Sequence, residues 1–345
     1  MRILITGGLG CIGTNYAAWR IKHGDDVFIL DNYARGQSSE LNAKWLLAMM
    51  PQPVIMKGSV TNYQDVMNIL AAAKWVDAVV HAAAQSSVNV SMTNPSLDFQ
   101  SNVIGTFNLL EGLRTECPQA CVVFIASNKI YDTTAWPVEL AGSRYRWIGR
   151  TMGPSDTFPF QTDAREPYGA SKISGLYYSR CYATMYNMPI VCMVPSGMAG
   201  AHQYGKTEQG WLGWFAIATE LGLPITIFGD GFQVRDMLDV RDVNRALDLL
   251  IDIAPGYKGS LFNLGGGSHN AISLIEAIRK IAECTGKTPR LEYTDWRPQD
   301  NKVYISNCEK LASLGWRPRI LLDDMISHIC EWVREERSNL EAIYT

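Results

Sequence analysis

Arg2-Ile-Leu-Ile-Thr6-Gly7-Gly8-Leu9-Gly10-Cys11-Ile12-Gly13, followed by a helical pattern from about Asn15, is the stretch that decides the fold. A run of β-forming residues leads into a glycine turn, and the turn leads into a helix, which together begin a βαβ unit. The glycines allow the tight turn, the close approach of an anion to the backbone and the close packing of helix on strand. Unpaired N–H groups at the positive end of the helix dipole then bind the anion.

The residues after this turn indicate which anion is bound. The first helix is predicted from about Asn15 to His23, and the apolar strand Val27-Phe-Ile-Leu30 ends at Asp31. An acid about 20 residues beyond the glycines, at the end of the second strand, can bond both ribose hydroxyls of NAD. Asp31 could instead only cap its strand, but strand, turn, helix, strand and acid follow in the order of a dinucleotide site.

NADP is the alternative cofactor. Arg35 lies near the same rim and could favour a 2′-phosphate, whereas Asp31 would repel it, so we predict NAD. The spacing Gly7-x-x-Gly10-x-x-Gly13 differs from G-x-G-x-x-G and resembles the version found in short-chain dehydrogenase/reductases.

Composition narrows the class of protein. With 345 residues and 47% hydrophobic content, the chain can form one large domain or a domain with a lobe. No apolar run reaches the ~20 residues of a membrane span, and the chain begins inside its first strand, so we expect neither a membrane anchor nor a signal peptide. A net charge of −3 without a basic run gives no support for nucleic-acid binding. The eight cysteines form no C-x-x-C pair, which predicts no metal and a reducing cytoplasm.

Strands and helices alternate through the first half. Further apolar runs predict strands at 53–57, 76–81, 121–126 and 189–194, with helices at about 62–73, 95–114 and 168–187. Apolar runs without alternation are typical of strands covered on both faces. The predicted fold class is therefore α/β, a Rossmann-type doubly wound parallel sheet in residues 1–195, with a smaller mixed α/β substrate lobe in residues 196–345. Some of the later chain is expected to return to the first domain.

Regular patterns stop between about 132 and 166, a stretch rich in aromatic residues and arginine. A long irregular segment in a compact domain is usually functional or disordered, and the aromatic content disfavours disorder. We interpret it as an active-site loop or lid. A packed surface excursion or an oligomer contact is an equal alternative.

Tyr168-Gly-Ala-Ser-Lys172 opens a predicted helix, so the phenol and the ammonium lie on one face. A neighbouring Lys⁺ and a positive nicotinamide ring would stabilise the phenolate and lower the tyrosine pKa from about 10. Tyr168 could then take a proton from a sugar hydroxyl. Ser127, at the end of a strand, could bond the same substrate oxygen; its alternative is a turn serine.

These residues, together with Asp31-Asn32, His81-Ala-Ala-Ala-Gln85 and Asn102-x-x-Gly105, resemble extended short-chain dehydrogenase/reductases that act on nucleotide sugars. The resemblance covers nearly the whole chain. Within that group, the chain is most similar to CDP-tyvelose (CDP-paratose) 2-epimerases. The stretches that narrow the match are Ser127-Asn-Lys-Ile-Tyr131, Thr207-Glu-Gln-Gly-Trp211, Gly229-Asp-Gly-Phe-Gln-Val-Arg-Asp236, Phe262-Asn-Leu-Gly-Gly-Gly-Ser-His-Asn270 and Trp296-Arg-Pro-Gln-Asp300.

The resemblance implies that tightly bound NAD oxidises a sugar carbon transiently, and that the keto-sugar turns before it is reduced on its other face. Tyr168 would be the acid/base, Lys172 its partner and Ser127 a second donor, while Arg235 and Arg297 would bind the diphosphate. The predicted cofactor contacts are Gly7, Gly10, Cys11, Ile12, Asp31, Asn32, Ser59, Val60, Ala82, Ala83, Ala84, Asn102, Tyr168, Lys172 and Pro195. The predicted substrate contacts are Gln85, Ser86, Asn128, Lys129, Gln209, Gly210, Trp211, Arg235 and Arg297.

Other reactions remain open on the same scaffold. The 4,6-dehydratases that the chain resembles carry an acidic pair after the strand-end hydroxyl, where this chain has Asn128 and Lys129, so we reject dehydration. A 4-epimerase, a decarboxylase, or a net reductase or dehydrogenase is the alternative, and a non-catalytic NAD sensor is less favoured because Tyr168 and Lys172 are both present. Relatives often pair helices, which implies a homodimer or homotetramer through about 95–114 and 168–187.

Overall fold

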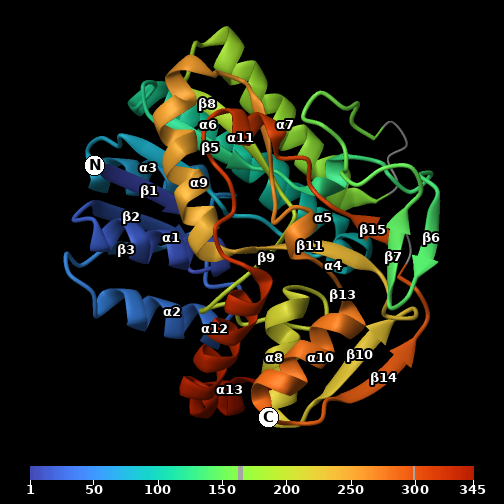
Figure 1. Ribbon diagram of the computed structural model, residues 1–345. Coiled ribbons are helices and arrows are strands. Elements are labelled where there is room, and N and C mark those ends of the chain that lie inside the picture. Colours follow the sequence, from blue (N-terminus) through green and yellow to red (C-terminus); the bar gives the residue numbers. More distant parts are fainter. Residues whose placement is uncertain (162–165, 298–299) are drawn as a thin grey trace. The chain divides into compact units, whose positions relative to one another are not determined.

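The computed structural model describes residues 1–161, 166–297 and 300–345 (Figure 1). These residues form two compact units. The first unit holds residues 1–130, 160–194 and 244–262, and the second holds 131–159, 195–243 and 263–345. The chain passes to the second unit near residue 195. Residues 131–159 also belong to the second unit, and residues 244–262 belong to the first.

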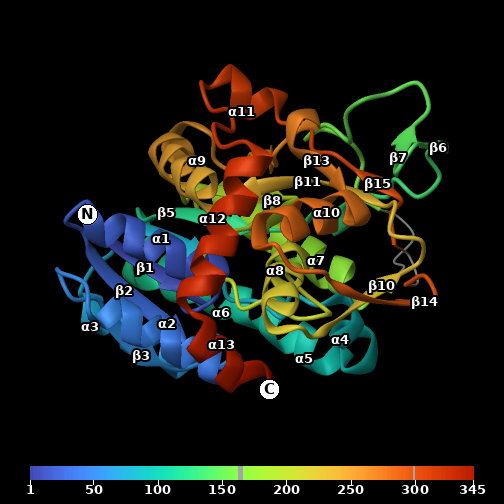
Figure 2. The ribbon, with the colours of Figure 1, turned by 60° about the horizontal axis from the view of Figure 1, so that its bottom comes forward.

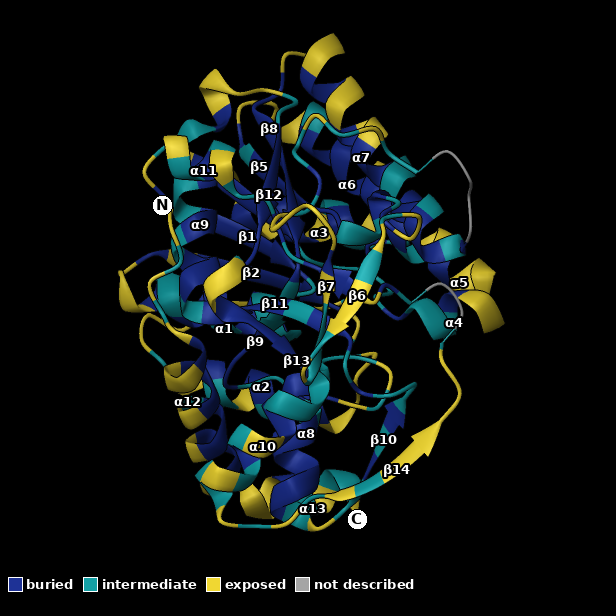
Figure 3. Ribbon diagram, turned by 45° about the vertical axis from the view of Figure 1, so that its right-hand side comes forward, coloured by how far each residue is buried: buried dark blue, intermediate teal, exposed yellow. Residues whose placement is uncertain are grey.

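A seven-stranded sheet in the order β12-β8-β5-β4-β1-β2-β3 forms the centre of the first unit. The pairings from β3 through β2, β1, β4 and β5 to β8 are all parallel. Strands β1, β4 and β8 are buried almost throughout, as Figure 3 shows, because helices cover both faces. The predicted Rossmann-type doubly wound fold is confirmed.

The elements of this part of the chain are β1 (Arg2–Thr6), α1 (Cys11–Lys22), β2 (Asp26–Asp31), α2 (Gln37–Leu47), β3 (Val54–Lys57), α3 (Tyr63–Ala73), β4 (Ala78–His81), α4 (Val88–Thr93), α5 (Pro95–Phe99), a π-helix (Gln100–Ile104), α6 (Gly105–Glu116), β5 (Cys121–Ile125), a 3₁₀ turn (Asn128–Ile130), α7 (Pro167–Met185), β8 (Ile190–Pro195), α9 (Val240–Ile253) and β12 (Leu261–Leu264). The single helix that we expected at 95–114 is interrupted by the π-helix.

Helices α3, α6 and α7 pack side by side over one face of the sheet. Their apolar residues form one core with strand residues that point to that face, such as Leu4, Val79 and Val122. Successive strand residues point to opposite faces, so Ile5 and Ile29 lie on the other face, where α1 contacts β1 and β2.

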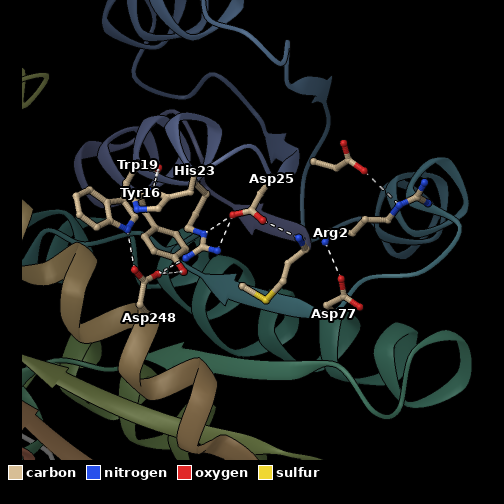
Figure 4. Close-up of polar contacts among 10 residues, drawn as sticks. Arg2, Tyr16, Trp19, His23, Asp25, Asp77 and Asp248 are labelled. Carbon is tan, nitrogen blue, oxygen red and sulfur yellow. Dashed lines mark hydrogen bonds and ion pairs between the residues drawn. The ribbon is translucent and has the colours of Figure 1, made fainter.

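Figure 4 shows why 244–262 returns to the first unit. The Asp248 carboxylate on α9 accepts hydrogen bonds from the Tyr16 hydroxyl (2.9 Å) and the Trp19 indole N–H (2.7 Å) on α1. Arg20 Nη1 donates to the same carboxylate at 2.8 Å. A single acid thus joins α9 to the helix that follows the glycine turn.

The second unit contains a parallel pair, β10 with β14, and a sheet in which β11 pairs with β13, β15 and β9. Helices α8, α10 and α12 pack against one another (Figure 2). The elements are β6 (Val138–Ala141), β7 (Arg144–Trp147), β9 (Gly197–Ala199), α8 (Trp211–Leu221), β10 (Pro224–Phe228), β11 (Val234–Asp239), β13 (Ala271–Ser273), α10 (Leu274–Thr285), β14 (Arg290–Thr294), β15 (Val303–Tyr304), α11 (Glu309–Ser313), α12 (Leu322–Glu335) and α13 (Arg337–Tyr344).

Part of the segment expected to be irregular is a β-hairpin. Strands β6 and β7 pair antiparallel around a two-residue turn, in which Gly142 has a φ of +66°. Trp147 is only 4% exposed and packs with Val234 and Val303 of the same unit. Each strand has only four residues, which is too short for a clear alternating pattern, although Gly142-Ser143 is a hairpin signal. Residues 162–165 of the expected loop lie outside the described residues.

Among the described residues, no helix is long and apolar enough to cross a membrane. The same residues contain no group of three or more His, Cys, Asp or Glu side chains that could hold a metal ion.

Candidate active site

The glycine turn between β1 and α1 has the geometry of a dinucleotide site. Gly7 has a φ of +65°, and a Cβ there would lie 2.6 Å from the backbone of Ala83. A Cβ on Gly13 would lie 2.5 Å from the Gly7 carbonyl oxygen, whereas one on Gly10 would meet nothing nearer than 3.4 Å. Gly10 is the N-cap of α1, and no side chain caps this helix. Cys11 and Ile12 form its first turn, so the arrangement fits a pyrophosphate group.

Asp31 ends β2 beside this turn. Its two oxygens accept hydrogen bonds from the backbone N–H groups of Leu9 (3.0 Å) and Tyr33 (2.8 Å). Burial raises the pKa of Asp31, and these N–H groups and the charge of Arg35 oppose the rise. The carboxylate is therefore held in place and can still accept from ribose hydroxyls. The neighbouring Asn32 side chain caps the backbone of Ala34 instead (3.0 Å).

Ser59 and Val60 follow β3. The Ser59 N–H donates to the Asp65 carboxylate at 2.8 Å, and the Ser59 hydroxyl bonds that of Thr61. Val60 is 6% exposed and leaves no room for a side chain on Gly105, since a Cβ there would lie 2.5 Å from Val60 Cγ2. The two residues thus lie at the carboxyl end of the sheet, where a parallel sheet binds ligands.

Ala82, Ala83 and Ala84 follow β4 at the same edge. His81 before them is buried, with its ring nitrogens bonded to Thr6 (2.7 Å) and Thr106 (3.0 Å). Burial, with a smaller effect of the Lys172 charge, lowers the pKa of His81 to about 3, so the ring is neutral. The small alanines leave space at this edge for a flat cofactor.

Tyr168 and Lys172 lie one turn apart near the start of α7, and both are buried. The Lys172 ammonium lies 5.2 Å from the centre of the Phe124 ring. Ser127 follows β5 and hydrogen-bonds the Tyr168 hydroxyl. The structure therefore brings the three predicted catalytic residues together.

Burial shifts the acid–base properties of this pair. Burial raises the pKa of Tyr168 to about 12; the Ser127 hydrogen bond opposes this, and the charges of Glu166 and Asp98 add to it. Burial lowers the pKa of Lys172 to about 8, against the effect of Asp98. Desolvation of the phenolate is the largest influence on Tyr168, so a lower pKa has to come from the charges that we predicted beside it, the Lys172 ammonium and the nicotinamide ring, and this part stays a prediction.

Three predicted site residues make bonds within the protein. The Gln85 amide donates to the Asp98 carboxylate and to the Ser87 carbonyl, both at 2.9 Å. The Asn102 amide donates to Gln85 O (2.9 Å), Asp98 Oδ1 (3.1 Å) and Ser171 Oγ (2.9 Å). Asn128 accepts a long bond of 3.5 Å from Ser127. Ser86 is partly buried and follows Gln85. Burial raises the pKa of Glu166, and the positive charge of Lys129 opposes this rise.

Sequence reasoning missed Asp98, which joins Gln85 and Asn102. Its signal was an acid four residues before Asn102, one helical turn away. That spacing alone does not show that the carboxylate is buried.

In the second unit, Arg235 lies close enough for its charge to act on Arg297. Arg235 forms an ion pair with Asp300 at 2.6 Å. Arg297 stacks 3.9 Å over the Phe228 ring, and its buried Nε finds no hydrogen-bond partner among the described residues. Burial lowers the pKa of Arg297; the charges of Asp300 and Glu208 oppose this, and the charge of Arg235 adds to it to a smaller extent. Two guanidinium groups and an unsatisfied buried donor can bind an anion such as a diphosphate once it displaces the Asp300 carboxylate.

The remaining predicted contacts lie near α8 or at the end of β8. Gly210 is the N-cap of α8 with a φ of +73°, and Trp211 begins the helix with its ring 5.4 Å from that of Phe215. Gln209 pairs its backbone with Lys206. Pro195 ends β8. Pro298 and Gln299, part of one motif in the resemblance, lie outside the described residues.

Comparison with known proteins agrees with this geometry. Residues 3–265 match the NAD dependent epimerase/dehydratase family. The chain is 29% identical to CDP-paratose 2-epimerase of Salmonella typhi, over 96% of this chain and 99% of the relative. It is 27% identical to UDP-glucose 4-epimerase of Mycolicibacterium smegmatis, over 97% and 99%.

Among solved structures, UDP-glucose 4-epimerase of Thermus thermophilus in complex with NAD superposes with a TM-score of 0.81. It is 28% identical in sequence, and the match covers 97% of this chain and 99% of that one. The predicted extended short-chain dehydrogenase/reductase type and the predicted isomerase class agree with these relatives. The chain belongs to the NAD dependent epimerase/dehydratase family.

Proposed function

We propose that the protein is an NAD-dependent nucleotide-sugar epimerase that oxidises one sugar carbon to a ketone and reduces it again on the opposite face. The observation that carries the proposal is the buried Tyr168–Lys172 pair, with Ser127 bonded to the phenol, in the unit that holds the glycine turn. NAD bound at that turn supplies a reversible hydride acceptor. We propose NAD rather than NADP, bound tightly through turnover, because Asp31 would repel a 2′-phosphate.

In this proposal the chain's own residues move and orient the proton. Tyr168 takes the proton of the reacting hydroxyl and later returns it, while the Lys172 ammonium stabilises the phenolate between the two steps. Ser127 donates a hydrogen bond to the same oxygen and keeps it next to the phenol. The proposed catalytic residues are therefore Tyr168, Lys172 and Ser127.

For the substrate we propose a CDP-sugar inverted at C2, of the CDP-paratose or CDP-tyvelose type. The relative named CDP-paratose 2-epimerase supports this, since it aligns over 96% of this chain. We propose that Arg235 and Arg297 bind the diphosphate, since planar guanidinium groups suit phosphate oxygens. The further predicted substrate contacts, including Gln209 and Trp211, extend the same proposal.

A 4-epimerase acting on a UDP-hexose or uronate is the second candidate. Relatives named UDP-glucose 4-epimerase and UDP-glucuronate 4-epimerase support it, since they match at 27% and 28% identity over nearly the whole chain. The two candidates share the catalytic residues and differ in the carbon presented to them.

A panel of CDP-, UDP-, GDP- and dTDP-sugars separates these candidates. Each nucleotide sugar is incubated with the purified protein, and proton NMR follows the configuration at every ring carbon. Inversion at C2 of a CDP-sugar, without net change in NADH absorbance, is the expected result. Inversion only at C4 supports the second candidate, and loss of water or net formation of NADH overturns epimerisation.

We also propose a cytoplasmic homo-oligomer that pairs α6 and α7 of two copies. In these helices Phe107 is 39% exposed, and its ring lies 6.0 Å from that of Tyr178, which is 45% exposed. Two-fold pairing would cover these rings. Sedimentation of the protein and of Phe107→Glu tests this: a monomeric wild type contradicts the proposal.

A further inference from the structure

A buried carboxylate lies close to the proposed catalytic lysine. Asp98, in α5, is 1% exposed. Its Oδ1 accepts hydrogen bonds from the side-chain amides of Gln85 (2.9 Å) and Asn102 (3.1 Å). Ser171, which immediately precedes Lys172, also hydrogen-bonds the Asp98 carboxylate. Uncharged amide groups thus hydrogen-bond the Asp98 carboxylate in a buried site, with the Ser171 hydroxyl beside them.

These donors also connect to the helix that carries Tyr168. The same Asn102 amide donates to the Ser171 hydroxyl at 2.9 Å, and that hydroxyl is bonded to the Tyr168 carbonyl at 2.9 Å. The π-helix at Gln100–Ile104 places Asn102 for these contacts, and π turns often occur at functional sites. Asp98 is therefore fixed to the turn of α7 between Tyr168 and Lys172.

The Lys172 ammonium has few charged neighbours. His81 of β4 is neutral, and the Phe124 ring of β5 lies 5.2 Å away. Among the described residues, Asp98 is the carboxylate whose charge raises the pKa of Lys172. A buried ammonium without an opposing charge loses its proton readily. Glu166, at the N-terminus of α7, acts on Tyr168 instead.

We propose that Asp98 is a positioning residue that keeps Lys172 in its ammonium form beside Tyr168. The inference rests on the proposed function, in which Lys172 must be charged to stabilise the phenolate. The hydrogen bonds from Gln85 and Asn102 hold the carboxylate, next to Ser171, near Lys172 without a direct ion pair among the described residues. Lys172 therefore stays able to bond a ribose or a phenolate.

The first test uses the protein without substrate and measures thermal unfolding between pH 6 and 10. The pKa of Lys172 is about 8 in the folded protein, below its ordinary value near 10.5. Between these values the unfolded chain binds more protons at Lys172, so the contribution of Lys172 to the unfolding free energy rises with pH from about 8. The difference between variant and wild type separates this contribution from that of the buried thiols, whose raised pKa values act in the opposite direction. Without the Asp98 charge, the pKa of Lys172 falls further. In Asp98→Asn this rise is therefore expected to begin about one pH unit or more lower.

The second test measures kcat against pH for the epimerisation. Activity of the wild type is expected to fall above about pH 8 as Lys172 loses its proton. In Asp98→Asn the fall begins about one pH unit lower, so kcat at pH 8 drops roughly five- to sixfold, because the charged fraction of Lys172 falls from about one half to about one eleventh. Asp98→Glu keeps the charge and should lose activity at the same pH as the wild type. A merely structural role of Asp98 would lower kcat equally at all pH values.

Asp248→Asn is the matched control. Asp248 is a carboxylate of the same unit that accepts three side-chain hydrogen bonds, and its partners lie on α1 rather than α7. This variant is expected to lose stability, but the pH at which kcat falls and the pH at which the unfolding free energy rises should both stay at the wild-type values. The proposal is overturned if Asp98→Asn loses kcat at the same alkaline pH as the wild type and if its unfolding free energy also begins to rise at the wild-type pH.

The remaining outcomes are also decisive. If Asp98→Asn does not fold, Asp98→Glu is the deciding variant. The proposal is overturned if kcat of Asp98→Glu begins to fall one pH unit or more below the pH at which the wild type loses activity. Should the wild type epimerise no nucleotide sugar, the proposed function fails, but the unfolding measurement still decides whether Asp98 sets the charge of Lys172.

Discussion

The two units of the molecule use charge in opposite ways. In the first unit, Tyr168, Lys172 and Asp98 are buried. Uncharged side chains hydrogen-bond Tyr168 and Asp98, and the Lys172 ammonium lies over the Phe124 ring. In the second unit, Arg235 and Arg297 are partly buried, and Arg235 is in direct contact with a carboxylate, Asp300, at 2.6 Å.

The difference follows from the chemistry of the groups. Burial raises the pKa of the Tyr168 phenol to about 12 and lowers that of the Lys172 ammonium to about 8, so the first unit can set which of them holds a proton. A guanidinium does not lose its proton in a protein, so burial of Arg297 cannot serve proton transfer. The first region therefore supports the proposed proton transfer, and the second supports the proposed binding of a diphosphate that replaces Asp300 on Arg235.

Tyr168→Phe gives the largest expected effect, because it removes the proton carrier and leaves the ring. We expect kcat to fall about 10²–10⁴-fold, the usual contribution of general acid–base catalysis, with unchanged NAD content. Turnover by NMR and the absorbance of released cofactor measure the two quantities.

Tyr177→Phe is the control for this change, since Tyr177 lies on the same helix and is 51% exposed. Its kcat should equal that of the wild type. If Tyr168→Phe retains more than a tenth of the wild-type rate, the buried region is not the site of proton transfer and the comparison fails.

Local patterns in the sequence predicted the first region well. The glycine turn, Asp31 and the Tyr168–Lys172 spacing each lie within one strand–turn–helix or one helical turn, so neighbouring residues determine their geometry. The shift of the Tyr168 pKa could not be predicted, because it depends on burial by elements distant in sequence. Asp98 was missed for the same reason, since Gln85, Asn102 and Ser171 surround it only in the fold.

The second region was harder to predict. Arg235 and Arg297 were named through resemblance, and nothing within either motif shows that their charges lie close to one another. The hairpin of β6 and β7 was missed because its strands are short, and because the burial of Trp147 depends on Val234 and Val303, far along the chain. In both cases long-range packing decides the structure.

Arg235→Ala tests the second region and is expected to raise KM for the nucleotide sugar about 10–100-fold. A lost charge-assisted hydrogen bond costs about 1.5–3 kcal/mol, which corresponds to that range. NAD content and the melting temperature should change little, because Arg235 is 16% exposed in its side chain and its partner Asp300 can be solvated.

Arg241→Ala is the control for Arg235→Ala. Arg241 also forms an ion pair with an aspartate in the second unit, Asp239 at 2.7 Å, and lies outside the proposed site. KM should stay at the wild-type value in this variant. An equal rise in KM for both variants would indicate a general loss of structure rather than a lost phosphate contact.

The smallest expected effect concerns how the hairpin is held in the second unit. Arg144 donates to both oxygens of Glu276, at 2.9 and 2.6 Å, and Glu276 also caps the start of α10. Arg146 pairs with Glu139 on the same hairpin, but both side chains are largely exposed. Since exposed pairs contribute little, Arg146→Ala should change the unfolding free energy by less than about 0.5 kcal/mol, and Arg144→Ala should lower it by about 1 kcal/mol. Urea unfolding of both variants measures the difference. Equal midpoints would mean that the packing of Trp147 alone holds the hairpin, and that ion pairs in this unit serve binding rather than stability.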